Sequence, residues 1–126
     1  MNIIKILAYL AVLSVASASS IAYAENNAEV KAAIDQTVAK LQEAVTAVDK
    51  GADAKVLADL VMEAKQLQKS IATSDAKVSI KKSQGSNKLG QARTAFNEGD
   101  VKKGGDLTKE ALADYLEVKE KYNATH

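Results

Sequence analysis

The sequence predicts an all-α protein, an antiparallel four-helix bundle made of two repeated αα-hairpins. Proline is absent from all 126 residues, so no proline interrupts a helix. After residue 26, aliphatic residues recur at steps of three and four, which is the spacing of one helix face. A segment in the first half of the chain is repeated in the second half, and this repeat pairs the helices into two hairpins.

Residues 1–24 are predicted to be a secretory signal peptide. Lys5 supplies the positive charge, residues 6–16 are apolar except for Ser14, and Ala22-Tyr23-Ala24 has the small-x-small form of a cleavage site. A transmembrane anchor is the alternative, but it needs about 20 mostly apolar residues, and serines follow this shorter run. We therefore expect a periplasmic protein whose bundle domain spans residues 25–126, with no stable membrane insertion after cleavage.

The first hairpin has clear helix signals. Asn26 and Glu29 have the spacing of a capping box, Gly51 is a helix stop, and Asp53 starts the next helix. The predicted core face of the first helix consists of Val30, Ile34, Val38, Leu41, Val45 and Val48. That of the second consists of Val56, Leu60, Ala64, Leu67 and Ile71, with Leu57 and Val61 widening it.

The second hairpin is less regular. Residues 73–75 (Thr-Ser-Asp) signal a helix start, but residues 81–88 contain no apolar side chain, so this stretch is either a loop or a poorly packed part of a helix. The third helix would bury Val78, Leu89, Ala92 and Phe96. The fourth would bury Val101, Leu107, Ala111, Leu112, Tyr115, Val118 and Tyr122, with its first turns weakened by Gly104 and Gly105.

The internal repeat resolves this ambiguity. Residues 41–48 match residues 89–96 at an offset of 48, Gly51 matches Gly99, and the match continues from Asp53 with Asp100 at an offset of 47. The repeats span about 27–72 and 75–122, so the third element is predicted to be one helix, softened in its first half. The small residues Ser83, Gly85 and Ser86 in this half are compatible with three arrangements: a close approach of a neighbouring helix, a groove, or a loosely packed end of the bundle.

Composition argues against several functions. The chain has no cysteine, which excludes disulfides and thiolate metal sites. Removing Lys5 from the 17 basic residues leaves 16, equal to the 16 acidic ones, and this balance argues against nucleic-acid binding. The only histidine is His126 at the last position, which disfavours haem and di-iron sites and leaves no base to activate a serine. We therefore expect no enzymatic activity, and the composition identifies no cofactor with certainty.

Two pairs of acids are the candidate metal ligands. Asp59 and Glu63 are spaced i, i+4, as are Asp106 and Glu110, and the pairs occupy equivalent places in the two repeats. Carboxylate oxygens suit a hard divalent cation. The plainer interpretation is a solvated ladder of i, i+4 pairs, with Lys55 beside Asp59 and Lys102 beside Asp106, each pair worth a few tenths of a kcal/mol.

The order of features resembles the bacterial small metal-binding protein family. The resemblance rests on residues 43–51 and 92–100, continued by residues 63–65 and 110–112, and covers about residues 29–120. It implies an exported four-helix bundle of two similar hairpins. Metal-binding members are rich in histidine along these helices, whereas this chain has Ala47, Ala52, Ala95 and Asp100 around the glycine stops. The resemblance therefore carries over no ligand residue.

Two functions follow from the sequence. The first is an exported, non-catalytic bundle protein that resembles small metal-binding proteins and binds a divalent metal ion weakly through surface carboxylates. The second is a periplasmic protein-interaction or chaperone-like module that docks a partner in a groove beside the third helix.

Overall fold

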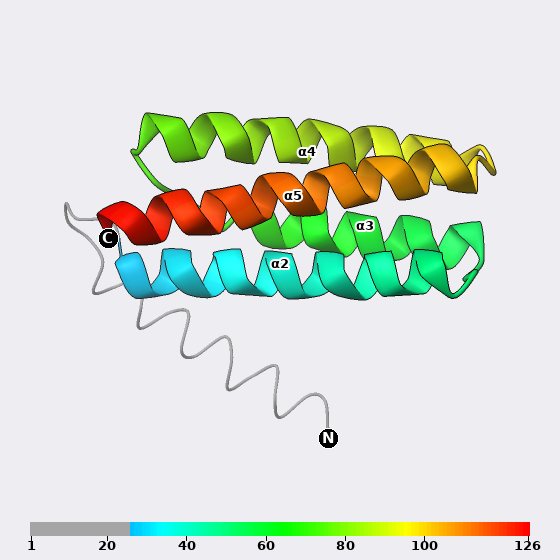
Figure 1. The fold of residues 1–126 in the computed structure, drawn as a ribbon, viewed down its shortest axis with the longest axis horizontal. Helices are drawn as coiled ribbons and strands as arrows, with labels where there is room; N and C mark the ends of the chain where they lie inside the picture. The colour runs from blue at the N-terminus through cyan, green and yellow to red at the C-terminus, as the bar shows by residue number, and fades with distance from the viewer. Residues whose placement is uncertain (1–25) are drawn as a thin grey trace, which may run out of the picture.

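The computed structural model describes residues 26–126, and this part of the chain contains four helices and no strand. The helices are α2 (Asn27–Asp49), α3 (Ala54–Gln68), α4 (Ala76–Asn97) and α5 (Val101–Thr125). They lie side by side as a bundle (Figure 1). The predicted all-α bundle is confirmed, while the predicted signal peptide lies outside the described residues.

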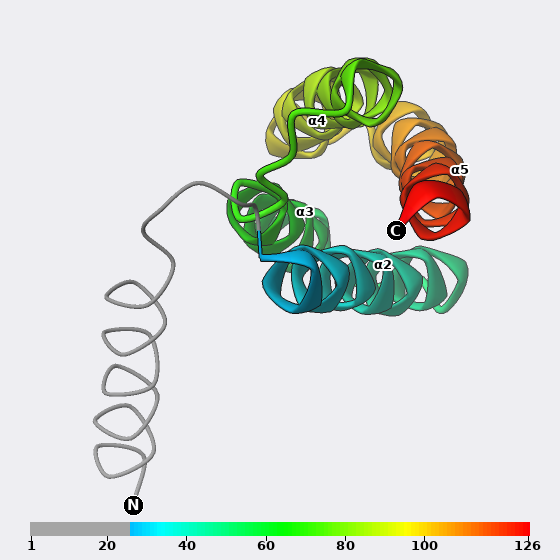
Figure 2. The ribbon, with the colours of Figure 1, turned by 90° about the vertical axis from the view of Figure 1, so that its left-hand side faces the viewer.

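The helices form a closed ring, in which each packs against two neighbours. The packed pairs are α2 with α3, α3 with α4, α4 with α5, and α5 with α2. Viewed along the bundle, α3 and α5 therefore occupy opposite corners (Figure 2). Within residues 26–126 no helix is sufficiently long and apolar to cross a membrane.

The helix ends form as the sequence predicts. The side chains of Asn26, Asp75 and Asp100 accept hydrogen bonds from backbone N–H groups in the first turns of α2, α4 and α5. Gly51 and Gly99 have φ angles of 78° and 82°, a conformation that side chains with a Cβ rarely adopt. Each glycine closes a Schellman motif, because its N–H and that of the next residue bond back to the last helical turn.

The core face of α3 differs from the predicted one. Leu57 and Val61, expected at its margin, are fully buried, whereas Val56 is 47% exposed and Leu60 and Leu67 are half-buried. The sequence allowed two neighbouring stripes on this helix, and the structure buries the one that includes a glutamine, Gln68. Apolar periodicity alone could not select a stripe with a polar member.

The stretch of α4 without apolar residues is helical, and Gly85 in its middle is buried against α5. A Cβ atom at Gly85 would lie 2.5 Å from the Tyr115 ring, so only glycine lets the two helices approach this closely. The Tyr115 ring thus fills the space where a groove was one of the expected arrangements. Of the three alternatives at this position, the structure shows the close approach.

The glycine pair at the start of α5 also permits close packing. A Cβ at Gly104 would lie 2.6 Å from the Phe96 ring, and one at Gly105 would lie 2.8 Å from Val48. These glycines lower the intrinsic helix propensity of α5, as the sequence predicts, but they bring its first turns against α4 and α2.

Candidate functional site

The four acids predicted as metal ligands are exposed and lie on opposite corners of the bundle. Asp59 and Glu63 belong to α3, and Asp106 and Glu110 belong to α5. Because α3 and α5 are not neighbours in the ring, the structure keeps the two pairs separate (Figure 2). Within residues 26–126 no three acidic or histidine side chains are grouped so that they could hold a metal ion.

One acid of each pair contacts a lysine on the neighbouring helix. Glu63 Oε2 lies 3.1 Å from Lys40 Nζ, which joins α3 to α2, and Glu110 Oε1 lies 3.9 Å from Lys88 Nζ, which joins α5 to α4. The two lysines are 48 positions apart and the two glutamates 47, as in the sequence repeat. Hydrogen bonds to Glu43 and Glu63 raise the pKa of Lys40. A cation would therefore compete with a lysine for each glutamate.

The acids of α5 border a shallow surface depression of about 410 Å³, here called the α5 hollow. It combines three carboxylates with two lysines and one leucine: Asp100, Asp106, Glu110, Lys102, Lys103 and Leu107. Lys102 forms the expected i, i+4 ion pair with Asp106, at 3.2 Å. Among the described residues, no corresponding pair joins Lys55 to Asp59. The α5 hollow thus gathers three carboxylates around one depression, with Asp106 already paired to a lysine.

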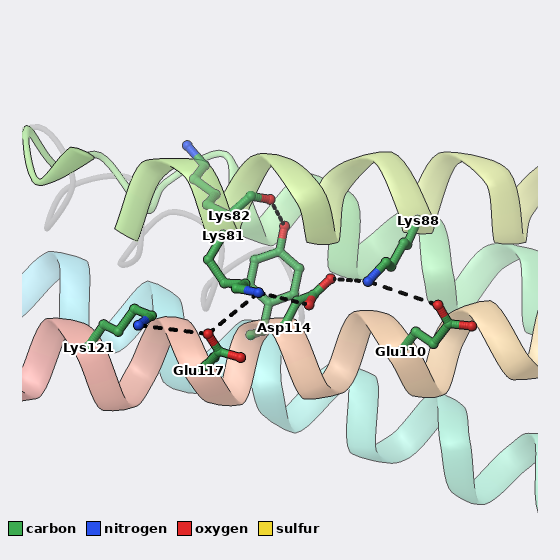
Figure 3. Close-up of polar contacts among 8 residues, drawn as sticks. Lys81, Lys82, Lys88, Glu110, Asp114, Glu117 and Lys121 are labelled. Carbon is green, nitrogen blue, oxygen red and sulfur yellow. Dashed lines mark hydrogen bonds and ion pairs between the residues drawn. The ribbon is translucent and has the colours of Figure 1, made fainter. Parts of the chain in front are cut away.

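A larger set of charges lies between α4 and α5 (Figure 3). Asp114 is the buried centre of this set, with a side chain only 8% exposed. Its Oδ2 accepts a hydrogen bond of 2.8 Å from Lys88 Nζ, and its Oδ1 lies 3.8 Å from Lys81 Nζ. The hydrogen bond to Asp114 raises the pKa of Lys88. A buried carboxylate with two cationic partners is a structural ion pair between helices.

Further ion pairs extend this set along the surface of α5. Glu117 Oε2 lies 3.5 Å from Lys81 Nζ and 3.8 Å from Lys121 Nζ (Figure 3). With Lys88 contacting both Asp114 and Glu110, positive and negative groups alternate along the α4–α5 boundary. Asp114 and Glu117 each contact two lysines, so this part of the set holds α4 and α5 together.

Tyr115 is fully buried beside this set. Its hydroxyl group lies 3.1 Å from Gln68 Oε1 and 3.0 Å from the carbonyl oxygen of Lys82, and these two acceptors share its single hydrogen. Burial, with a smaller contribution from the negative charge of Asp114, raises the pKa of the Tyr115 phenol well above its usual value. The folded protein therefore keeps this phenol neutral at pH values where an unfolded tyrosine is ionised.

This raised pKa predicts a loss of stability in alkali. Above the ordinary tyrosine pKa of 10.0 the unfolded chain loses the Tyr115 proton while the folded chain keeps it, so stability falls as the pH rises. Tyr115 ionisation in the unfolded chain lowers the free energy of unfolding by about 1.4 kcal/mol for each pH unit above 10.0. Urea unfolding of the parent and of Tyr115→Phe should show a shallower alkaline decline in the variant. Equal slopes would contradict the assignment.

A second depression crosses the outer face of α4 and is here called the α4 hollow. Its volume is about 500 Å³, and its lining is polar except for one glycine: Lys65, Ser86, Asn87, Gly90, Gln91, Thr94 and Lys103. Lys65 reaches it from α3 and Lys103 from α5. The groove expected beside the third helix was one for an apolar segment, whereas this hollow offers charge and hydrogen bonds.

The single histidine lies at the end of α5. The His126 ring stacks on the Tyr122 ring with centroids 4.0 Å apart and an interplanar angle of 9°. Lys31 Nζ donates to the His126 carbonyl oxygen at 3.1 Å, which attaches this end to α2. The terminal histidine is thus packed against the bundle.

Sequence reasoning missed three features of this surface. Lys40 and Lys88 were detectable, because they stand at matching positions of the repeat, as do the glutamates they contact. Asp114 gave no such signal, since the matching residue of the first hairpin is Leu67. The α4 hollow involves three different helices, and only the fold brings its lining together.

No family model, no curated protein and no solved structure matches this chain.

Proposed function

We propose that the chain is an exported, non-catalytic bundle protein of the periplasm that binds divalent cations weakly through its surface carboxylates. The observation that supports this proposal is the α5 hollow, where Asp106, Glu110 and Asp100 border one depression, although the three are not grouped closely enough to hold an ion jointly. Oxygen ligands of this kind attract hard cations. The order of sequence features that resembles small metal-binding proteins gives further support.

We also propose that the bundle consists of two antiparallel αα-hairpins with a common origin. The same Schellman motif ends α2 and α4, at Gly51 and Gly99. Residues at matching positions of the repeats are fully buried in both copies: Leu41 and Leu89, Ala44 and Ala92, Ala64 and Ala111. Gln68 and Tyr115 also stand at matching positions, and their side chains bond to each other in the core. These agreements support a duplicated hairpin.

The cation binding in this proposal is weak for a physical reason. Asp106 contacts Lys102 and Glu110 contacts Lys88, so an arriving cation must displace or share a lysine partner. The carboxylates are exposed to solvent, which reduces the attraction to about that of a surface ion pair. We expect little selectivity among divalent ions and a marked loss of binding at high salt.

The proposal is tested by calorimetric titration with calcium, zinc, nickel and copper. The protein is compared with a variant that lacks the four repeated acids, Asp59→Asn, Glu63→Gln, Asp106→Asn and Glu110→Gln. We expect weak, saturable heats in the parent that decrease severalfold in the variant, because each removed carboxylate contributes to the attraction.

A matched control separates specific carboxylates from overall charge. Four other exposed acids are replaced in the same proportion of aspartate and glutamate: Asp35→Asn, Asp49→Asn, Glu98→Gln and Glu120→Gln. This control should retain more of the parent's binding than the test variant. Equal losses in both would show that the cation responds only to net charge, and the assignment to these four acids would be wrong.

The alternative function is a periplasmic protein-interaction or chaperone-like module. The observation in its favour is Ile80 of α4, which is 60% exposed on the helix that also carries the α4 hollow. An apolar peptide that binds equally well with and without a chelator, and less well to Ile80→Ser, would support this alternative. Peptide binding unaffected by that substitution would argue against it.

A further inference from the structure

Gly90 is the one glycine of this chain that neither a positive φ angle nor close packing requires. Two of the six glycines have a positive φ angle and three have side chains of other residues within 3.0 Å of where a Cβ would stand: Gly51 and Gly99, then Gly85, Gly104 and Gly105. Gly90 lies within helix α4, and the nearest atom to its Cβ position is Lys65 Nζ at 3.9 Å, an ordinary contact. Glycine within a helix lowers stability, so its presence here needs another reason.

Gly90 lines the α4 hollow, where a longer side chain would fill the space. The hollow is bordered on one side by Lys65 from α3 and on the other by Lys103 from α5. No carboxylate lines it, and within residues 26–126 neither lysine forms an ion pair. Seven other lysines of the bundle do form such pairs: Lys40, Lys81, Lys88, Lys102, Lys109, Lys119 and Lys121. The lining of the α4 hollow therefore carries two lysines and no acid, although Lys103 also borders the α5 hollow and its carboxylates.

Lys65 is held in place at the edge of the hollow. Its Nζ donates to Ser86 Oγ at 2.9 Å and to the Ser86 carbonyl oxygen at 3.2 Å. These bonds use two of the three ammonium hydrogens and leave one for a ligand. The Ser86 hydroxyl accepts from Lys65, so its own hydrogen is available for donation. A fixed ammonium group with neighbouring hydroxyl and amide donors is suited to an oxyanion.

The first hairpin lacks this arrangement at the matching positions. Gln42 stands where the second hairpin has Gly90, and Glu43 stands where it has Gln91. The positions that match Lys65 and Lys103 carry Leu112 and Val56. The second hairpin thus has no side chain at position 90 to fill the hollow and no acid at position 91 to repel an anion.

We propose that the α4 hollow binds a small molecule bearing a carboxylate or phosphate group. The oxyanion lies between Lys65 and Lys103, and Gly90 keeps the space open for it. This site goes beyond the proposed cation binding, because it has the opposite charge preference and a different helix as its floor.

The test uses the protein purified after expression of the full chain, with inorganic phosphate and citrate as separate probes at constant ionic strength. Amide signals of the protein are followed by NMR during each titration. We expect saturable shifts at residues 86–94 with at least one probe. Saturation by phosphate alone or citrate alone identifies which oxyanion chemistry the hollow prefers, and either result supports the proposal.

Gly90→Gln is the decisive variant, since it introduces the residue that the first hairpin has at the matching position. Its Cβ makes only an ordinary contact with Lys65 Nζ, at 3.9 Å, so the helix should form normally, and an unchanged or higher melting temperature shows that the fold is intact. We expect this variant to lose the saturable shifts.

Charge variants complete the test. Lys65→Gln and Lys103→Gln should each weaken binding about tenfold, the effect of losing one charge-assisted contact of about 1.4 kcal/mol. Lys55→Gln removes an equal charge from an exposed position of α3 outside the hollow and should leave binding unchanged. The proposal is overturned if neither probe saturates, if Gly90→Gln binds like the parent, or if Lys55→Gln weakens binding as much as the two test variants.

Discussion

Tyr115→Ala is expected to lower the free energy of unfolding by about 3–5 kcal/mol, the usual cost of removing a buried aromatic ring. Tyr115 is fully buried at the centre of the bundle. Its removal leaves a cavity between α4 and α5 and withdraws a hydrogen-bond donor from Gln68 Oε1 and from the Lys82 carbonyl oxygen. Urea unfolding followed by circular dichroism measures this loss.

A double-mutant cycle with Gly85 tests the physical reason for this packing. Gly85→Ala alone should cost about 1–3 kcal/mol, because its Cβ would stand 2.5 Å from the Tyr115 ring. In a Tyr115→Leu background that contact is absent, and the same substitution should become neutral or slightly stabilising. Equal costs of Gly85→Ala in both backgrounds would show that the ring is not what excludes a side chain at this position.

Asp114→Ala is expected to lower the free energy of unfolding by about 2–3 kcal/mol, since it removes a buried charged acceptor from two lysines. The affected groups are Lys88 Nζ, 2.8 Å from the Asp114 carboxylate, and Lys81 Nζ, 3.8 Å from it. Both lysines retain some exposure and can turn toward water, so the cost stays below that of a fully enclosed pair.

Glu117→Ala serves as the control for Asp114. Glu117 contacts Lys81 and Lys121 but is 46% exposed, so its loss should cost less than about 1 kcal/mol. Added salt should reduce the effect of Glu117→Ala more than that of Asp114→Ala. If the two substitutions cost the same at every salt concentration, Asp114 is not acting as a buried partner.

The boundaries of the helices were predictable because local chemistry decides them. Side-chain caps at Asn26, Asp75 and Asp100 and glycine stops at Gly51 and Gly99 act within a few residues of the chain. The repeat added information that no single segment contained. It indicated that the polar stretch of residues 81–88 is helical, as the structure shows.

The packing of particular side chains was less predictable, because it depends on partners from distant helices. Gln68 lies in the core, where its Oε1 accepts a hydrogen bond from the Tyr115 hydroxyl, and this partner on α5 cannot be read from the α3 segment alone. From the sequence, Gly85 is expected only to weaken the helix, whereas in the structure it makes room for the Tyr115 ring.

The candidate ligands were found by their spacing, but their partners were not. The i, i+4 pattern located the acids of α3 and α5, while the lysines that contact Glu63 and Glu110 lie on the neighbouring helices. The α4 hollow requires α3, α4 and α5 together, so no local pattern in the sequence could indicate it.

The most direct test of weak cation binding at the repeated acids is an NMR titration of the protein with calcium. We expect the amide signals around Asp106 and Glu110, and more weakly those around Asp59 and Glu63, to shift in fast exchange. Signals of residues 86–94 beside the α4 hollow should respond less, because no carboxylate lines this hollow and Lys65 repels cations there. Tight binding in slow exchange, or shifts concentrated away from α3 and α5, would contradict cation binding by these carboxylates.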